Sequence, residues 1–188
     1  MAPEASPVRD RFRFNERKAT AAAAFLLQQE GGTMDYMRLV KLLYLAERES
    51  LARLGHPLAG DTYYALDQGP ILSRVLDLCK HNSSGTWAGQ IERSGLWAVH
   101  LKGTPDLGPL SPAEMTILED VAKTYRDRDQ WELSTLTHEL PEWKDPRGSR
   151  IEIAPADILA AVGKSPAQIR EILDEAGDDA EVDAVLGG

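Results

Sequence analysis

The residues that most resemble a chemical motif lie near position 140, where His138, Glu139 and Glu142 match part of the zinc-binding pattern HExxH. The full pattern requires a second histidine where this chain has Glu142. Pro141 would also interrupt the helix that must present both ligands. We therefore expect no metal at this position and no cofactor elsewhere in the chain.

A cysteine nucleophile is a second chemical possibility. Cys79 is the single cysteine, and His81 follows two positions later without an evident residue to orient it as a base. Free cysteines commonly behave as small buried apolar residues, and we expect that role for Cys79. One cysteine cannot form an intrachain disulfide, which favours a reducing compartment.

Four tryptophans could stack nucleic-acid bases, namely Trp87, Trp97, Trp131 and Trp143. Such platforms normally accompany a basic groove. This chain has 21 basic and 30 acidic residues, and so a net charge of −9. We therefore expect the tryptophans to pack in the core or in a hairpin. The charge favours a basic protein partner and opposes direct binding of nucleic acid or of an anionic membrane surface.

Arg38, Lys41 and Arg48 are spaced to lie along one side of a helix, where they could hold an anion. Acidic residues stand near enough to pair with them at i,i+3 or i,i+4 spacing, namely Asp35, Glu47 and Glu49. The pattern therefore favours a solvent-exposed edge of the helix on which acidic and basic side chains neutralise one another.

The helix that carries these basic residues is predicted to span residues 33–55. Between residues 36 and 45 only two basic residues interrupt a run of Tyr, Met, Leu and Val. Apolar side chains that nearly encircle a helix are typical of one buried on most sides. Thr33 is the expected N-cap, Asp35 lies in the first turn, and Gly55 can end the helix in a left-handed conformation.

Capping signals predict the other helices. Asn15 precedes an alanine-rich helix, and Pro70 is suited to the first position of a helix that continues to residue 80. Capping boxes begin at Ser111 and Asp129, and residues 165–168 open a further helix.

Two regions read as extended structure. Residues 61–67 mix aromatic and polar side chains and predict a short extended segment. Residues 87–101 predict a β-hairpin around residues 92–95, with Trp97, Val99 and Leu101 alternating on one side.

These patterns predict a mainly α fold, a compact multi-helical domain around a buried central helix with one small β-hairpin. We assign residues 1–14 to a flexible N-terminal lead in which Phe12 and Phe14 dock, and residues 15–144 to the helical domain. Residues 145–188 form a C-terminal helical extension that begins irregularly and ends in an acidic tail, from Gly177 onward, as a loose final turn or a disordered segment. No apolar run reaches the roughly 20 residues of a membrane span, and the first residues lack the apolar core of a signal peptide. A cytoplasmic protein is expected.

Residues 41–79 resemble the Panacea domain, the family of SocA-like antitoxins found beside phage genes and in bacterial toxin–antitoxin pairs. The family pattern has a KLLYLA helix, a glycine–proline turn, a short extended segment and a GPV signature that opens the next helix. Here these parts are residues 41–46, 55–58, 61–67 and 69–71, with isoleucine in place of the usual valine. The family's closing Leu-Thr-His and tryptophan correspond to residues 136–138 and Trp143, so the resemblance covers residues 19–144.

The resemblance implies a non-catalytic domain that neutralises a cognate protein toxin, encoded by a neighbouring gene, through direct binding. Many partners of the family block translation, and one member delivers its toxin to a protease. We expect the partner surface where the signature breaks regular structure, at Tyr63, Tyr64, Asp67, Gln68, Gly69 and Arg74. The structural alternative is that the tyrosines pack beneath the turn and that Asp67 caps the helix beginning at Pro70.

Other signature residues are expected to hold the fold, namely Leu43, Tyr44, Pro70, His138 and Trp143. We expect the last two to lock the final helix of the domain to the central one. Two further functions remain open. A proteolytic adaptor would use the acidic tail to contact a protease as well as its cargo, and a hydrolase would need a site built from Cys79, His81 and His138.

Overall fold

The structure is a computed structural model that describes residues 11–81 and 84–186, with side chains described as far as Asp178. Within these residues the chain is mainly α, as predicted, with eight helices and six strands. The helices are α1 (Glu16–Gln29), α2 (Tyr36–Leu54), α3 (Ser73–Lys80), α4 (Thr86–Gln90), α5 (Pro112–Thr124), α6 (Gln130–His138), α7 (Pro155–Ala161) and α8 (Pro166–Leu186). The strands are β1 (Thr33–Asp35), β2 (Tyr63–Leu66), β3 (Gly69–Leu72), β4 (Ile91–Ser94), β5 (Ala98–Leu101) and β6 (Ile151–Ile153).

The helices begin where capping residues satisfy their free N–H groups. The side chain of Asn15 accepts from the backbone N–H of Lys18, and both predicted capping boxes at Ser111 and Asp129 are present. The prediction that Thr33 caps α2 is wrong. The side chain of Asp35 accepts from the first N–H groups of the helix, and Thr33 belongs to β1. Gly55 ends α2 with a φ of 75°, as predicted.

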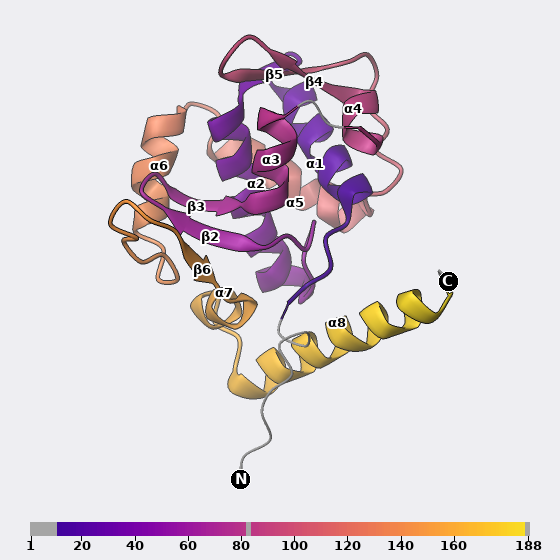
Figure 1. Cartoon of the computed structure of the whole chain (residues 1–188), viewed down its shortest axis with the longest axis vertical. Helices are drawn as coiled ribbons and strands as arrows, with labels where there is room; N and C mark the ends of the chain where they lie inside the picture. The colour runs from indigo at the N-terminus through magenta and orange to yellow at the C-terminus, as the bar shows by residue number, and fades with distance from the viewer. Residues whose placement is uncertain (1–10, 82–83, 187–188) are drawn as a thin grey trace.

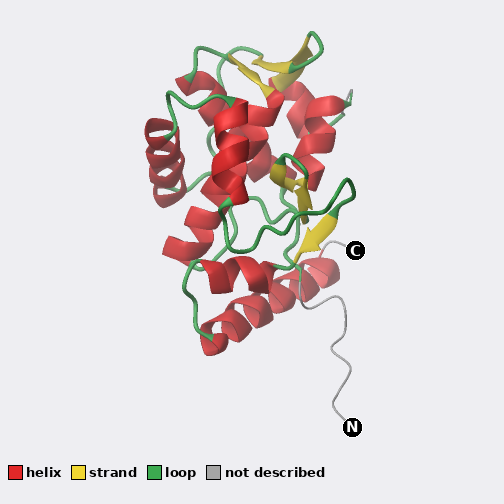
Figure 2. Cartoon of the chain, turned by 90° about the vertical axis from the view of Figure 1, so that its left-hand side faces the viewer, coloured by secondary structure: helices red, strands yellow, loops and turns green. Residues whose placement is uncertain are grey.

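Two three-stranded sheets replace the single hairpin that the sequence predicted. Their strand orders are β1-β5-β4 and β3-β2-β6, and all pairs are antiparallel. Figures 1 and 2 show the first sheet at one end of the molecule and the second nearer α7. The predicted hairpin is present as β4 and β5, but its turn is at residues 95–97 and not at 92–95, and the segment before residue 91 belongs to the helix α4. Val99 and Leu101 are buried as expected, but Trp97 lies in the turn and is exposed.

Pro70 lies in a strand and does not begin a helix. It pairs with Ala65 of β2, and α3 starts three residues later at Ser73. A proline cannot donate to a β ladder, but β3 is an edge strand, where the missing N–H costs little. The segment after Gly69 therefore runs back along β2 before it turns into the helix.

The C-terminal extension is more regular than expected. Residues 151–153, predicted to be irregular, form β6 on the outer side of β2. The acidic tail, predicted to be a loose turn or disordered, continues α8 to Leu186 along one side of the molecule (Figure 1). Phe12 is buried and Phe14 packs on the core, as predicted. The remainder of the predicted flexible lead, residues 1–10, lies outside the described residues.

Candidate partner-binding site

The polar residues of α2 hold remote segments of the chain and do not form a solvated edge. Arg38 is buried and donates to three backbone carbonyls in residues 125–128, and it also pairs with Glu30. Lys41 has no exposed surface, and its Nζ donates to the carbonyl of Pro70 at 2.8 Å. Each of these contacts reaches another part of the chain, which i,i+4 spacing could not indicate.

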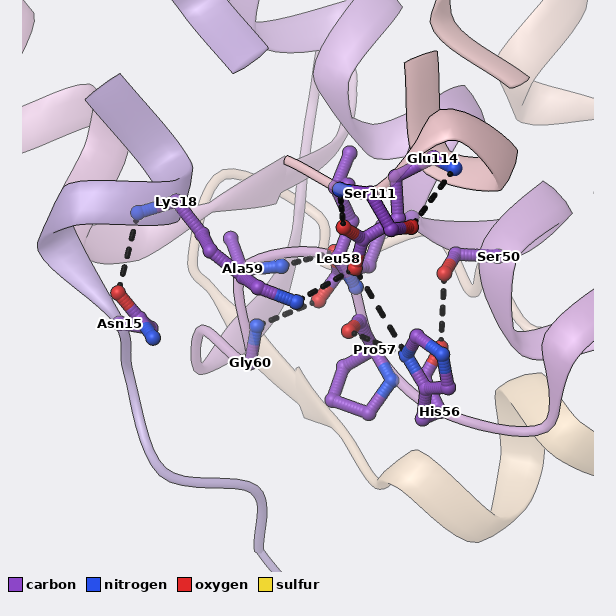
Figure 3. A network of polar contacts seen from close by, with 11 residues as sticks. Asn15, Lys18, Ser50, His56, Pro57, Leu58, Ala59, Gly60, Ser111 and Glu114 are labelled. Carbon is purple, nitrogen blue, oxygen red and sulfur yellow. Dashed lines mark hydrogen bonds and ion pairs between the residues drawn. The ribbon is translucent and has the colours of Figure 1, made fainter. Parts of the chain in front are cut away.

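Glu47, also on α2, anchors the turn that leads into the signature segment. Its carboxylate accepts from the backbone N–H groups of residues 58, 59 and 60 and from the hydroxyl of Tyr63. Burial raises the pKa of Glu47, while these four hydrogen bonds act to lower it. Figure 3 shows the backbone of this turn next to the ion pair between Lys18 and Glu114, whose atoms lie 2.6 Å apart. The turn is therefore held from beneath by α2 and flanked by α1 and α5.

Two of the residues that resemble part of a zinc motif, His138 and Glu142, make contacts that stabilise the fold. Glu142 is buried and pairs with Arg48 of α2 at 2.5 Å, and the hydroxyl of Tyr44 donates to the same carboxylate. His138 stacks on Trp143 with ring centroids 4.2 Å apart. The indole N–H of Trp143 donates to the carbonyl of Leu66. The stacked pair of His138 and Trp143 therefore joins the end of α6 to β2.

The described residues include no cluster of three or more His, Cys, Asp or Glu side chains able to hold a metal ion. Cys79 is buried in α3, and burial raises the pKa of its thiol well above the ordinary range. A thiol that resists ionisation is a poor nucleophile, which weighs against the hydrolase hypothesis.

A cavity of about 690 Å³ lies where the start of α2, the β2–β3 turn, α3 and the start of α6 meet. Its lining includes the indoles of Trp97 and Trp131, which are 64% and 60% exposed. We call these two side chains the aromatic rim. Trp97 is positioned by Tyr36, since the two rings stack at 6.1 Å and the Tyr36 N–H donates to the Trp97 carbonyl.

Charged side chains of both signs line this cavity. Burial lowers the pKa of the Lys41 amine from its ordinary 10.5 to about 7. Asp35 caps α2 through its carboxylate, and Asp67 accepts from the backbone N–H of Gly148 at 2.9 Å. The hydroxyl of Ser134 donates to the carbonyl of Gln68, which fixes the β2–β3 turn against α6.

The structure brings only two of the six predicted binding residues to the cavity, Asp67 and Gln68, both of them exposed. Asp67 does not cap a helix, because β3 follows the turn instead. Arg74 is exposed but lies over the ring of Phe14, with 5.4 Å from its guanidinium carbon to the ring centroid.

The remaining three predicted residues offer little surface. Tyr63 and Gly69 are buried, and Tyr64 is half-buried beneath the guanidinium of Arg150. Sequence reasoning missed the aromatic rim, because it placed those tryptophans in the core or in hairpin packing. One available signal was the position of Trp131 in the first turn after the cap at Asp129, between the polar residues Gln130 and Glu132.

A ligand-sized cavity and exposed tryptophans are features common in binding domains. Residues 39–144 match the family described as antitoxin SocA-like, Panacea domain, and since the match covers more than half of the sequence, the chain belongs to this family. The resemblance predicted from the sequence is thereby confirmed. Comparisons with curated proteins and with solved structures gave no match.

Membership of this family supports an antitoxin role in general and implies a toxin as the kind of partner. It also favours a non-enzymatic role. Among residues 11–81 and 84–186, none of the helices combines the length and the apolar composition that crossing a membrane requires.

Proposed function

We propose that this protein neutralises a toxin by binding it directly, and that the toxin docks over the aromatic rim. The observation that carries the proposal is the family match over residues 39–144, which includes both rim tryptophans and the signature turn between β2 and β3. Tryptophan is a favoured anchor at protein interfaces, because it buries a large area with few rotatable bonds.

The exposure of the rim agrees with this proposal. Four large apolar side chains of the described residues are exposed, and two of them line the cavity, while Leu96 is the neighbour of Trp97. The net charge of −9 would speed association with a basic partner. A toxin that blocks translation by acting on RNA or nucleotides has such a surface, and we propose a toxin of that kind.

The test is co-expression with the product of the adjacent gene, scored by growth rescue and by co-purification on a tag. The double variant Trp97→Ala/Trp131→Ala should lose both, while its melting temperature stays close to that of the wild type because both side chains are exposed. Ile151→Ala is the matched control, since Ile151 is also exposed and apolar but does not line the cavity. Full rescue and co-purification by the double variant would place the toxin elsewhere.

A proteolytic adaptor is the second candidate, and the length of α8 favours it. The last described side chains of α8 that pack on the core are Leu173 and Ala176, yet the helix continues to Leu186. We propose that this acidic end is available to a protease. Deleting residues 177–188 should abolish degradation of the toxin by an adaptor, whereas a sequestering antitoxin should still rescue growth.

A further inference from the structure

The two indoles of the aromatic rim carry no cation of the protein itself. Arginine side chains of this chain lie over two other aromatic rings, those of Phe14 and Tyr64. Within the part of the chain that the structure describes, neither Trp97 nor Trp131 has such a partner. An indole attracts a cation to its face more strongly than the ring of Phe or Tyr does. The rim therefore leaves two strong cation-binding surfaces open.

Two carboxylates that line the same cavity keep unused accepting capacity. The N–H groups that bond to Asp35 both donate to its Oδ1, and the N–H of Gly148 donates to the Oδ1 of Asp67. The Oδ2 atom of either residue accepts no hydrogen bond from the described residues. Asp67 is exposed and Asp35 is half-buried, so solvent reaches both residues. A carboxylate uses both oxygens in a bidentate contact, and both residues retain one oxygen for a cationic donor.

The charge that an incoming group meets in this cavity is negative. Lys41 has no exposed surface and its Nζ donates to the carbonyl of Pro70, so a group entering the cavity does not meet its amine. Lys80 is exposed, and it is the one accessible cation among the described residues of the lining. Two carboxylates therefore stand against one ammonium group. The rest of the lining is largely apolar and includes Leu66 and Leu76.

We propose that this cavity receives an arginine side chain of the toxin, an inference that rests on the proposed function. The guanidinium stacks on an indole of the aromatic rim and pairs with the carboxylates of Asp35 and Asp67. Arginine fits better than lysine, because a guanidinium is planar, is weakly hydrated and stacks on aromatic rings, whereas an ammonium is compact and strongly hydrated. The net charge of −9 complements such a basic partner. Arginine is also among the residues that most often anchor a protein interface.

The first test titrates N-acetyl-arginine amide and N-acetyl-citrulline amide into the isotope-labelled full chain and follows the indole N–H signals by NMR. Citrulline carries a urea group with the shape of a guanidinium but without its charge. At low and constant ionic strength, the arginine probe should bind roughly fivefold more tightly and shift the signal of Trp97 or Trp131. Equal affinity of the two probes, or a shift of neither signal, would overturn the proposal.

Asparagine substitutions test the two carboxylates without removing the hydrogen bonds that they accept. Asp35→Asn and Asp67→Asn should each lower the affinity of the arginine probe roughly twofold and leave that of the citrulline probe unchanged. The fold should survive, since asparagine is as good a helix cap as aspartate. Asp106→Asn is the matched control, because Asp106 is exposed and accepts from a glycine N–H but lies outside the cavity. Lys80→Met should act in the opposite direction and tighten binding of the arginine probe. Unchanged affinity in both cavity variants contradicts the assigned contacts.

The product of the adjacent gene separates this proposal from the proposed function. Its complex with the double variant Asp35→Asn/Asp67→Asn should dissociate roughly tenfold faster than its complex with Asp106→Asn. Co-purification that requires Trp97 and Trp131 but not the two carboxylates would overturn the arginine anchor and leave the proposed function intact. Co-purification that requires neither pair would refute the docking site together with the anchor.

Discussion

Replacing Lys41 with methionine should make the stability of this protein much less dependent on pH. Methionine retains the apolar stem and removes the amine that is buried against Pro70. Because burial lowers the pKa of this amine to about 7, the folded chain binds fewer protons than the unfolded chain between that value and 10.5. By linkage, the free energy of unfolding of the wild type must rise with pH across this window.

The magnitude follows from the two pKa values. Stability changes by roughly 1 kcal/mol for each pH unit between the two pKa values, so from about pH 6 to about pH 9 the wild type should gain roughly 3 kcal/mol relative to Lys41→Met. Near pH 6 the variant should be the more stable protein, because the desolvated charge is gone while the lost hydrogen bond is worth only about 1.5–3 kcal/mol.

The assay is urea denaturation of both proteins at several pH values, followed by circular dichroism. The quantity to compare is the difference between the two free energies of unfolding, because titration of Cys79 and of the tyrosines is common to both proteins and cancels. A difference that stays constant from pH 6 to pH 9 would show that the Lys41 amine keeps its proton in the fold, and the reasoning about its burial would be refuted.

Three other substitutions test the core. Leu43→Asp should unfold the chain, because Leu43 is 2% exposed and an unpaired buried carboxylate costs several kcal/mol; a cooperative melt at the wild-type temperature would contradict this. Glu47→Ala should lower the free energy of unfolding in urea by roughly 3–5 kcal/mol, since it leaves four buried donors without an acceptor; a loss below about 1 kcal/mol would show that water replaces the carboxylate. Gly69→Ala should cost at least about 2 kcal/mol by the same measurement, through a strained φ and contact with Thr137; the double variant Gly69→Ala/Thr137→Ala should recover only part of the loss, and full recovery would rule out backbone strain.

Local signals predicted the helices well because they depend on residues three or four positions apart. The capping boxes at Ser111 and Asp129, the cap at Asn15 and the glycine stop at Gly55 all operate within one helical turn. The prediction that Pro70 begins a helix was wrong because its fixed φ suits both the start of a helix and an edge strand. Which of the two occurs depends on β2, against which Pro70 pairs.

The candidate site was harder to predict, because its parts come from distant segments. Lys41 looked like one member of a solvated edge, and only its contact with Pro70, 29 positions away, shows that it is buried. Trp97 and Trp131 resembled core residues by type, and their exposure depends on a turn and on a helix start that meet across the cavity. Asp67 and Gln68 lie at the cavity as parts of the β2–β3 turn, and a turn of this kind is a local feature of the sequence.

Strand β6 limits where this protein can be truncated without exposing the edge of a sheet. It lies outside residues 39–144, the region that matches the family, yet it pairs with β2 from Tyr63 to Ala65 and buries Ile153. A fragment ending at residue 144 would leave β2 with a bare row of N–H and C=O groups along one side. Unpaired edges of this kind recruit strands from other copies, so we expect such a fragment to self-associate even though it contains the whole family match.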